Sequence, residues 1–84
     1  MEGINYFEPI PGKRYYVVYP LRELPPEIVE VICCTCTSAV VSIIASEFDE
    51  NNNVETPGVL HYHDPNEERT SVIGLFGGAE WSEV

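Results

Sequence analysis

The chain has 84 residues, and its fourteen acidic residues outnumber four Lys and Arg residues to give a formal charge of −10 at neutral pH. So little positive charge argues against direct binding to nucleic acid or to an anionic membrane, because both surfaces attract Lys and Arg. The apolar content, 44% of the residues, is ordinary for a globular protein and argues against disorder, and the length predicts a single domain over residues 1–84.

The first strand is predicted near the N-terminus, where Arg14 is followed by five aromatic or β-branched residues that stop at Pro20. Residues 26–36 come next and begin with proline, which suits the first turn of a helix. Their apolar side chains recur at helical spacing, so a short helix is predicted there. Because Ile, Val, Cys and Thr are mediocre helix formers, a strand is the competing interpretation.

Three more strands are predicted in the second half of the chain, over residues 39–48, 58–63 and 70–76. Turns rich in Asn and Asp separate them at 49–53 and 64–67, and short turns join antiparallel neighbours. The resulting order, β-α-β-β-β, predicts a small α+β domain in which one helix packs on a three- to four-stranded antiparallel sheet. The alternative is an all-β sandwich or barrel.

The location of the protein is predicted from its terminus and its cysteines. The first seven residues have neither a basic nor an apolar stretch, so no secretory signal is expected. Residues 31–46 carry no charge, but they are shorter than the ~20 residues of a membrane-spanning helix and are interpreted as buried core. The three cysteines cannot all pair with one another, so free, mostly buried thiols in a reducing, cytoplasmic compartment are expected.

Two short motifs suggest metal ligands, one with three cysteines and one with two histidines. Cys34 and Cys36, with His61 and His63, would supply a Cys₂His₂ set that suits zinc. The spacings are unusual, because the common two-residue gap occurs only between Cys33 and Cys36 and a single residue separates the histidines. No metal or other cofactor is therefore expected, and a zinc-binding protein that uses these five residues is kept as an alternative.

The sequence predicts that the protein is not an enzyme. The cysteines lie in the most apolar part of the chain, where a reactive thiolate is disfavoured. The glycines of residues 74–78 are not followed by a helix, as a phosphate-binding loop requires. Residues 49–53 begin like a calcium loop, but Val54 stands where the loop needs glycine and Leu60 where it needs an acid.

The acidic residues concentrate in the two predicted turns, and a rigid array of carboxylates can imitate the phosphates of nucleic acid in a basic groove. Aromatic residues near the termini, Tyr6, Phe7 and Trp81, are candidate anchors, because interfaces favour Tyr, Trp and Phe. The predicted partner-binding residues are Asp49, Glu50, Glu55, Asp64, Glu67, Glu68 and Trp81.

The predicted function is that of a non-enzymatic acidic binding protein, an inhibitor or adaptor that docks on a basic protein surface such as that of a nucleic-acid-binding protein. Phage proteins that block host defence nucleases are of this general type, and the comparison rests on type and not on any motif. Besides the zinc protein, a structural homo-oligomer such as a homodimer is a further alternative. It would bury the apolar strand edge of residues 15–19.

Overall fold

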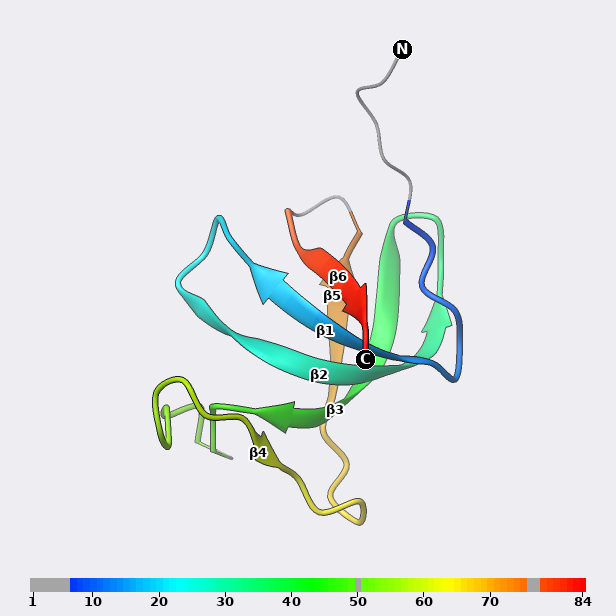
Figure 1. Cartoon of the computed structure of the whole chain (residues 1–84). Coiled ribbons are helices and arrows are strands. Elements are labelled where there is room, and N and C mark those ends of the chain that lie inside the picture. The colour runs from blue at the N-terminus through cyan, green and yellow to red at the C-terminus, as the bar shows by residue number, and fades with distance from the viewer. Residues whose placement is uncertain (1–6, 50, 76–77) are drawn as a thin grey trace.

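The computed structural model describes residues 7–49, 51–75 and 78–84, and these form one antiparallel sheet (Figure 1). The described residues form no helix, and so they contain none that is long and apolar enough to cross a membrane. The strands are β1 (Arg14–Tyr19), β2 (Leu24–Cys34), β3 (Ser38–Ser46), β4 (His61–Tyr62), β5 (Thr70–Gly74) and β6 (Glu80–Glu83).

The sheet has the order β4-β3-β2-β1-β6, and β5 shares the outer edge of β3 with β4. β5 pairs with residues 38–42 of β3, whereas β4 pairs with Ala45 and Ser46 near the end of that strand. The sheet curls so that β5 passes behind β1 and β6 in Figure 1, and side chains from β1 and β5 meet in one core. The hydrophobic core therefore lies on the inner, concave face of the curled sheet.

The core consists of side chains that alternate along neighbouring strands and face inward together. Cross-strand partners supply it in pairs, because residues opposite each other in a ladder share one face of the sheet. Tyr15 faces Val29, Val31 faces Val41, and Ala39 faces Ile73. The buried cluster is Tyr15, Val17, Val29, Val31, Ala39, Val41 and Ile73.

The predicted helix over residues 26–36 is wrong, because residues 26–34 lie in β2 and residues 35 and 36 follow it without helical structure, and the α+β class is wrong with it. The molecule is all-β in the described residues. Proline marks a bulge here and not a helix start: Pro25 and Pro26 fall where the pairing of β2 with β1 shifts register. Ile32 is a second irregularity, an extra residue that shifts the pairing with β3. These shifts interrupt the two-residue alternation, so the apolar residues recur at a spacing that also fits a helix.

The predictions of the other strands are partly confirmed. Strands do form at residues 39–48, 58–63 and 70–76, but β3 begins one residue earlier, at Ser38, β4 has only two residues, and residue 76 lies outside the described residues. Residues 80–83, for which no strand was predicted, form β6 and pair with β1. β1 is consequently an interior strand between β2 and β6, so the expected apolar edge at residues 15–19 is not an edge.

Candidate functional site

The structure brings the two predicted acidic turns together beside β4. An open cleft is lined by both segments, among them Asp49 and Glu55 from the first and Asp64 and Glu67 from the second. A second hollow next to it is lined by Asp49, Glu67 and Glu68. We call this region, residues 48–49, 51–55 and 61–70, the acidic end. The predicted residue Glu50 lies outside the described residues.

Short polar side chains fix the backbone of both turns. The Oδ1 atom of Asp49 accepts hydrogen bonds from the backbone N–H groups of Asn51 (2.8 Å) and Asn53 (2.9 Å). Asp64 does the same for the N–H of Asn66 at 2.8 Å. Asn52 has a φ of 63°, a left-handed conformation that asparagine tolerates better than most residues. The acidic turns are thus held in defined conformations by their own side chains.

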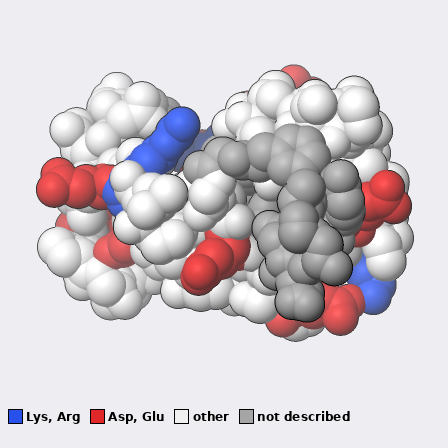
Figure 2. Space-filling view, turned by 90° about the horizontal axis from the view of Figure 1, so that it is seen from above, with Lys and Arg blue, Asp and Glu red and all other residues white. Residues whose placement is uncertain are grey.

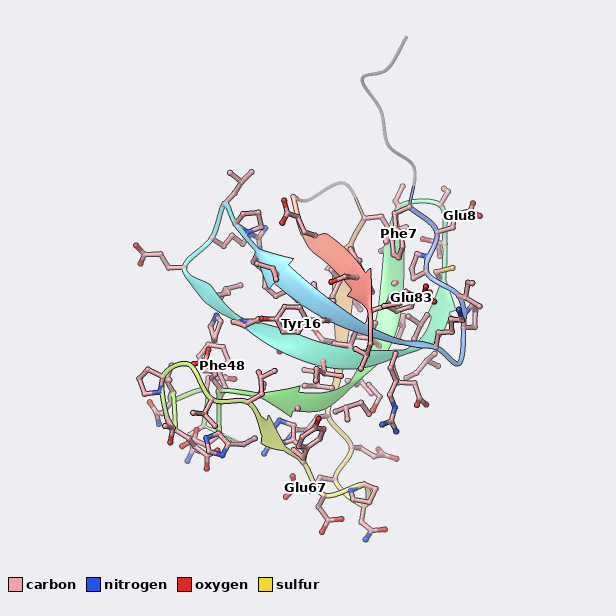
Figure 3. All side chains as sticks on the ribbon, in the orientation of Figure 1. Phe7, Glu8, Tyr16, Phe48, Glu67 and Glu83 are labelled. Atoms are coloured by element: carbon pink, nitrogen blue, oxygen red, sulfur yellow. The ribbon has the colours of Figure 1, made fainter. Side chains whose placement is uncertain are left out.

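The charge of the acidic end is mostly uncompensated. Arg69 is the basic residue of this region and pairs with Glu67, with 3.2 Å between its Nε and the carboxylate. Two other bases are engaged elsewhere: Lys13 pairs with Glu83, and Arg14 pairs with Glu30 at 3.1 Å. Figure 3 shows Glu67 on the β4 side of the molecule, far from Glu83. Within the described residues, Asp49, Glu55, Asp64 and Glu68 form no ion pair with Lys or Arg.

The view from the opposite side differs in charge. Figure 2 looks at the molecule from the side that is uppermost in Figure 1, away from β4. Outside the undescribed residues, the visible surface there is mostly uncharged, with acidic and basic side chains scattered over it. The acidic end therefore differs in charge from this face of the molecule.

The two histidines belong to the acidic end and pack against its loops. The Nε2 atom of His63 lies 3.0 Å from Ser46 Oγ, and burial, followed by the charge of Arg69, lowers the pKa of this histidine. His61 Nδ1 lies 3.7 Å from the carboxylate of Glu55. Both rings line the cleft, and protonation of His63 adds a positive charge to it.

The cysteines and histidines of the suggested zinc site do not meet. Cys34 pairs with Ala39 at the start of β3, and His61 pairs with Ser46 at its end. Seven residues of strand between those positions span roughly 23 Å, which is far beyond a metal–ligand distance. Among residues 7–49, 51–75 and 78–84, no group of three or more His, Cys, Asp or Glu side chains could hold a metal ion.

The thiols themselves are less buried than expected. Cys33 and Cys36 are exposed, Cys34 is half-buried, and all three are free. The extra residue at Ile32 turns Cys33 to the outer face of the sheet opposite Val40. The prediction of mostly buried thiols is therefore wrong.

Trp81, the predicted aromatic anchor, lies on β6 and packs into the core. Its ring centroid is 5.6 Å from that of Tyr15 and 5.6 Å from that of Phe7. β6 is at one edge of the strand order and β4 at the other, so Trp81 is not beside the acidic turns. An aromatic residue that does line the acidic cleft is Tyr62, whose side chain is 73% exposed.

A pocket that the sequence did not indicate lies at the open end of the curled sheet. It has a volume of about 420 Å³ and is lined by Tyr19, Glu27, Ile43 and Phe48, among others. Glu27 is the cross-strand partner of Val17, so its carboxylate lies on the inner face. We call this cavity the open-end pocket. Recognition of β2 as a strand would have revealed it, because Glu27 then shares a face with Val29 and Val31.

A hydrogen bond joins Tyr19 and Glu27 in the open-end pocket. The Tyr19 hydroxyl donates to the Oε1 atom of Glu27 at 2.9 Å. Burial raises the pKa of Glu27, and the hydrogen bond from Tyr19 partly opposes this effect. Burial also raises the pKa of Tyr19, and the nearby charge of Glu27 adds to it, so the phenol keeps its proton and remains a donor.

The open-end pocket adjoins the acidic end. Phe48 lines both this pocket and the acidic cleft. Asn52 and Thr70 line both this pocket and the second hollow. The open-end pocket, the acidic cleft and the second hollow therefore form one continuous surface, and each of them is lined by at least one carboxylate.

Comparison with protein-family models, with curated proteins and with solved structures gives no match for this chain. Its function is therefore inferred from its own geometry.

Proposed function

We propose that the chain is a non-enzymatic binding protein that docks through its acidic end onto a basic surface of a protein partner, and so acts as an inhibitor or adaptor. A nucleic-acid-binding surface is one such partner surface. The observation that carries the proposal is the meeting of two acidic turns around one cleft, with one pairing arginine among the described residues there. Clustered like charge attracts an oppositely charged partner and speeds encounter.

Rigidity of the turns supports this role. The hydrogen bonds of Asp49 and Asp64 hold both segments in place. Glu47 is buried and accepts a hydrogen bond from the N–H of Gly58, which fastens the first loop to the sheet. Preorganised carboxylates lose less conformational entropy on binding than those of a flexible tail. The exposed side chain of Tyr62 lines the acidic cleft and supplies an aromatic contact among the carboxylates.

We also propose a cytoplasmic location, which is supported by three free cysteines. The homo-oligomer alternative is less well supported, because β1 is paired on both sides. The zinc alternative is also less well supported, because its cysteines and histidines lie beside opposite ends of β3.

The test is the binding of a short arginine-rich peptide, measured by fluorescence anisotropy at several salt concentrations. The variant Asp49→Asn/Glu55→Gln/Glu67→Gln/Glu68→Gln removes four charges from the acidic end. We expect its affinity to fall by about tenfold or more and its salt dependence to weaken, because screened charge pairs supply the attraction.

A matched variant separates local charge from net charge. Glu8→Gln/Glu23→Gln/Glu80→Gln/Glu83→Gln removes the same number of charges from other parts of the chain and should retain most of the affinity. Equal losses in the two variants would mean that only net charge matters, and the proposal would be wrong.

A further inference from the structure

The open-end pocket combines one carboxylate with a wall of both polar and apolar side chains. Glu27 stands on the inner face of β2, with its Oε1 held by the Tyr19 hydroxyl at 2.9 Å. Ile43, Phe48 and Ile73 line the same cavity. A volume of about 420 Å³ lies in the range of small-ligand sites and admits a long side chain.

The carboxylate of Glu27 has no cationic partner among the described ion pairs. Arg22 also lines the cavity, but it is exposed at the rim and forms no ion pair with Glu27. Tyr19 satisfies one oxygen through a hydrogen bond and does not neutralise the charge. A carboxylate removed from water in this way gains most from a cation that enters the pocket.

A ligand that complements this pocket needs a cationic head and an apolar stem. Arginine has both: its guanidinium hydrogen-bonds to a carboxylate in a planar geometry, stacks on aromatic rings, and is weakly hydrated, so that its desolvation costs less than that of an ammonium group. Tyr19 and Phe48 supply the rings in the lining. An anionic ligand would be repelled by Glu27.

We propose that the open-end pocket receives one arginine side chain of the partner, with its guanidinium on Glu27 and its methylene stem against Ile43 and Ile73. The inference rests on the proposed function and deepens it. The pocket shares Phe48, Asn52 and Thr70 with the hollows of the acidic end, so a basic chain that lies on the acidic turns reaches the pocket with a neighbouring side chain.

The experiment is a titration of the isotopically labelled chain with N-acetyl-arginine amide, followed by NMR. The expected result is saturable chemical-shift change at Tyr19, Glu27 and Ile73, with a dissociation constant in the millimolar range. The neutral isostere N-acetyl-citrulline amide should bind about tenfold or more weakly, because it lacks the charge that Glu27 recognises. Equal binding of the two compounds would overturn the proposal.

N-acetyl-lysine amide tests the choice of arginine. It carries the same charge without the planar guanidinium, so we expect it to bind more weakly than the arginine compound. If lysine binds as tightly, the pocket reads charge alone and the assignment to arginine is wrong.

Two variants locate the contact. Glu27→Gln keeps the size of the side chain and should lower the affinity for the arginine compound by about tenfold. Glu30 lies on the same strand but faces the other side of the sheet and pairs with Arg14. Glu30→Gln should therefore leave the affinity unchanged. An unchanged affinity in Glu27→Gln would overturn the proposal even if the chain binds arginine elsewhere.

The failure of this inference is distinguishable from that of the proposed function. One outcome is that the arginine compound causes no chemical-shift change in the pocket, while neutralisation of the acidic turns still abolishes peptide binding. In that case the docking function stands and the pocket inference is wrong. If Glu27→Gln removes arginine binding but the acidic turns have no effect on the peptide, the pocket inference stands and the docking proposal is wrong.

Discussion

Tyr15 and Tyr19 lie four residues apart on β1 and face the same interior, yet their surroundings differ. Tyr15 is 2% exposed and packs between Phe7 and Trp81, with ring centroids 5.4 and 5.6 Å away. Its hydroxyl oxygen accepts a hydrogen bond from the N–H of Ile10 at 2.9 Å. Tyr19 is half-buried, borders the open-end pocket and donates its hydroxyl proton to Glu27.

The difference shows that the two ends of the curled sheet have different roles. At one end, Phe7 and the tryptophan of β6 cover the inner face with apolar surface. At the other end, a carboxylate occupies an inner-face position and a cavity remains. We call the first the closed end and the second the open end. We infer that the closed end contributes mainly to stability and that the open end is less stable because its cavity and carboxylate serve binding.

The largest expected difference between the ends is in the cost of removing each tyrosine. Tyr15→Ala should lower the free energy of unfolding by about 3–5 kcal/mol, because it leaves a cavity among tightly packed rings. Tyr19→Ala should cost only about 1–2 kcal/mol, because its side chain is partly in contact with water already. Urea unfolding of both variants measures the difference.

Tyr15→Phe is a milder variant for the case in which Tyr15→Ala does not fold. It keeps the ring and leaves the Ile10 N–H without its acceptor, for a loss of about 1 kcal/mol. Equal losses for the two alanine variants would contradict the division between a closed and an open end.

A smaller effect is expected from the charge of Glu27. Because burial raises its folded pKa above the unfolded value of 4.5, the unfolded chain releases this proton first as the pH rises. Stability is therefore lost between pH 4.5 and the folded pKa and stays lower at neutral pH. Glu27→Gln should unfold at a higher urea concentration than the wild type at pH 7, and the two should converge below pH 4.5.

The control for this prediction is Glu30→Gln, which removes an acid from the outer face of the same strand. Its partner is Arg14 at 3.1 Å, an exposed pair worth less than about 1 kcal/mol. It should show no gain at pH 7. A wild-type stability that does not change across the titration of Glu27 would argue against a desolvated carboxylate.

The smallest expected effect concerns His63 at the acidic end. Its pKa is lowered below 6.5 by burial, followed by the charge of Arg69, with Glu67, Glu55 and His61 also nearby. As the pH falls below 6.5, the unfolded chain takes up a proton first, so stability is lost until the folded pKa is passed.

His63→Gln keeps a polar group near Ser46 and should remove that loss. The comparison is the urea midpoint of wild type and variant at pH 7 and pH 5. A parallel decline in both proteins would assign the pH dependence to other groups.

The sequence was informative where a single period or a turn composition governed the structure. The first strand and the apolar run that became β3 follow from β-branched and aromatic residues, and the turns at 49–53 and 64–67 follow from Asp and Asn that cap their own backbone. The acidic turns and their carboxylates were also visible, although their meeting around one cleft depends on the short pairing of β4 with β3.

The sequence was uninformative where long-range pairing overrides local pattern. β2 contains bulges that disrupt its alternation, so its residues fit a helix until β1 and β3 pair on both sides. β6 has only four residues and two acids, and it forms because it completes the edge of β1. The open-end pocket was hidden for the same reason, since the inward direction of Glu27 follows from its register with Val17.

The most direct test of the whole account is the footprint of an arginine-rich peptide on the labelled chain, mapped by amide chemical shifts at physiological salt. We expect the amides of residues 49, 51–53 and 64–70 and those around Glu27 to shift together, while the amides around Tyr15 and Trp81 do not shift. Shifts centred on the closed end, or spread evenly over every exposed acid, would contradict a binding surface built from the acidic end and the open-end pocket.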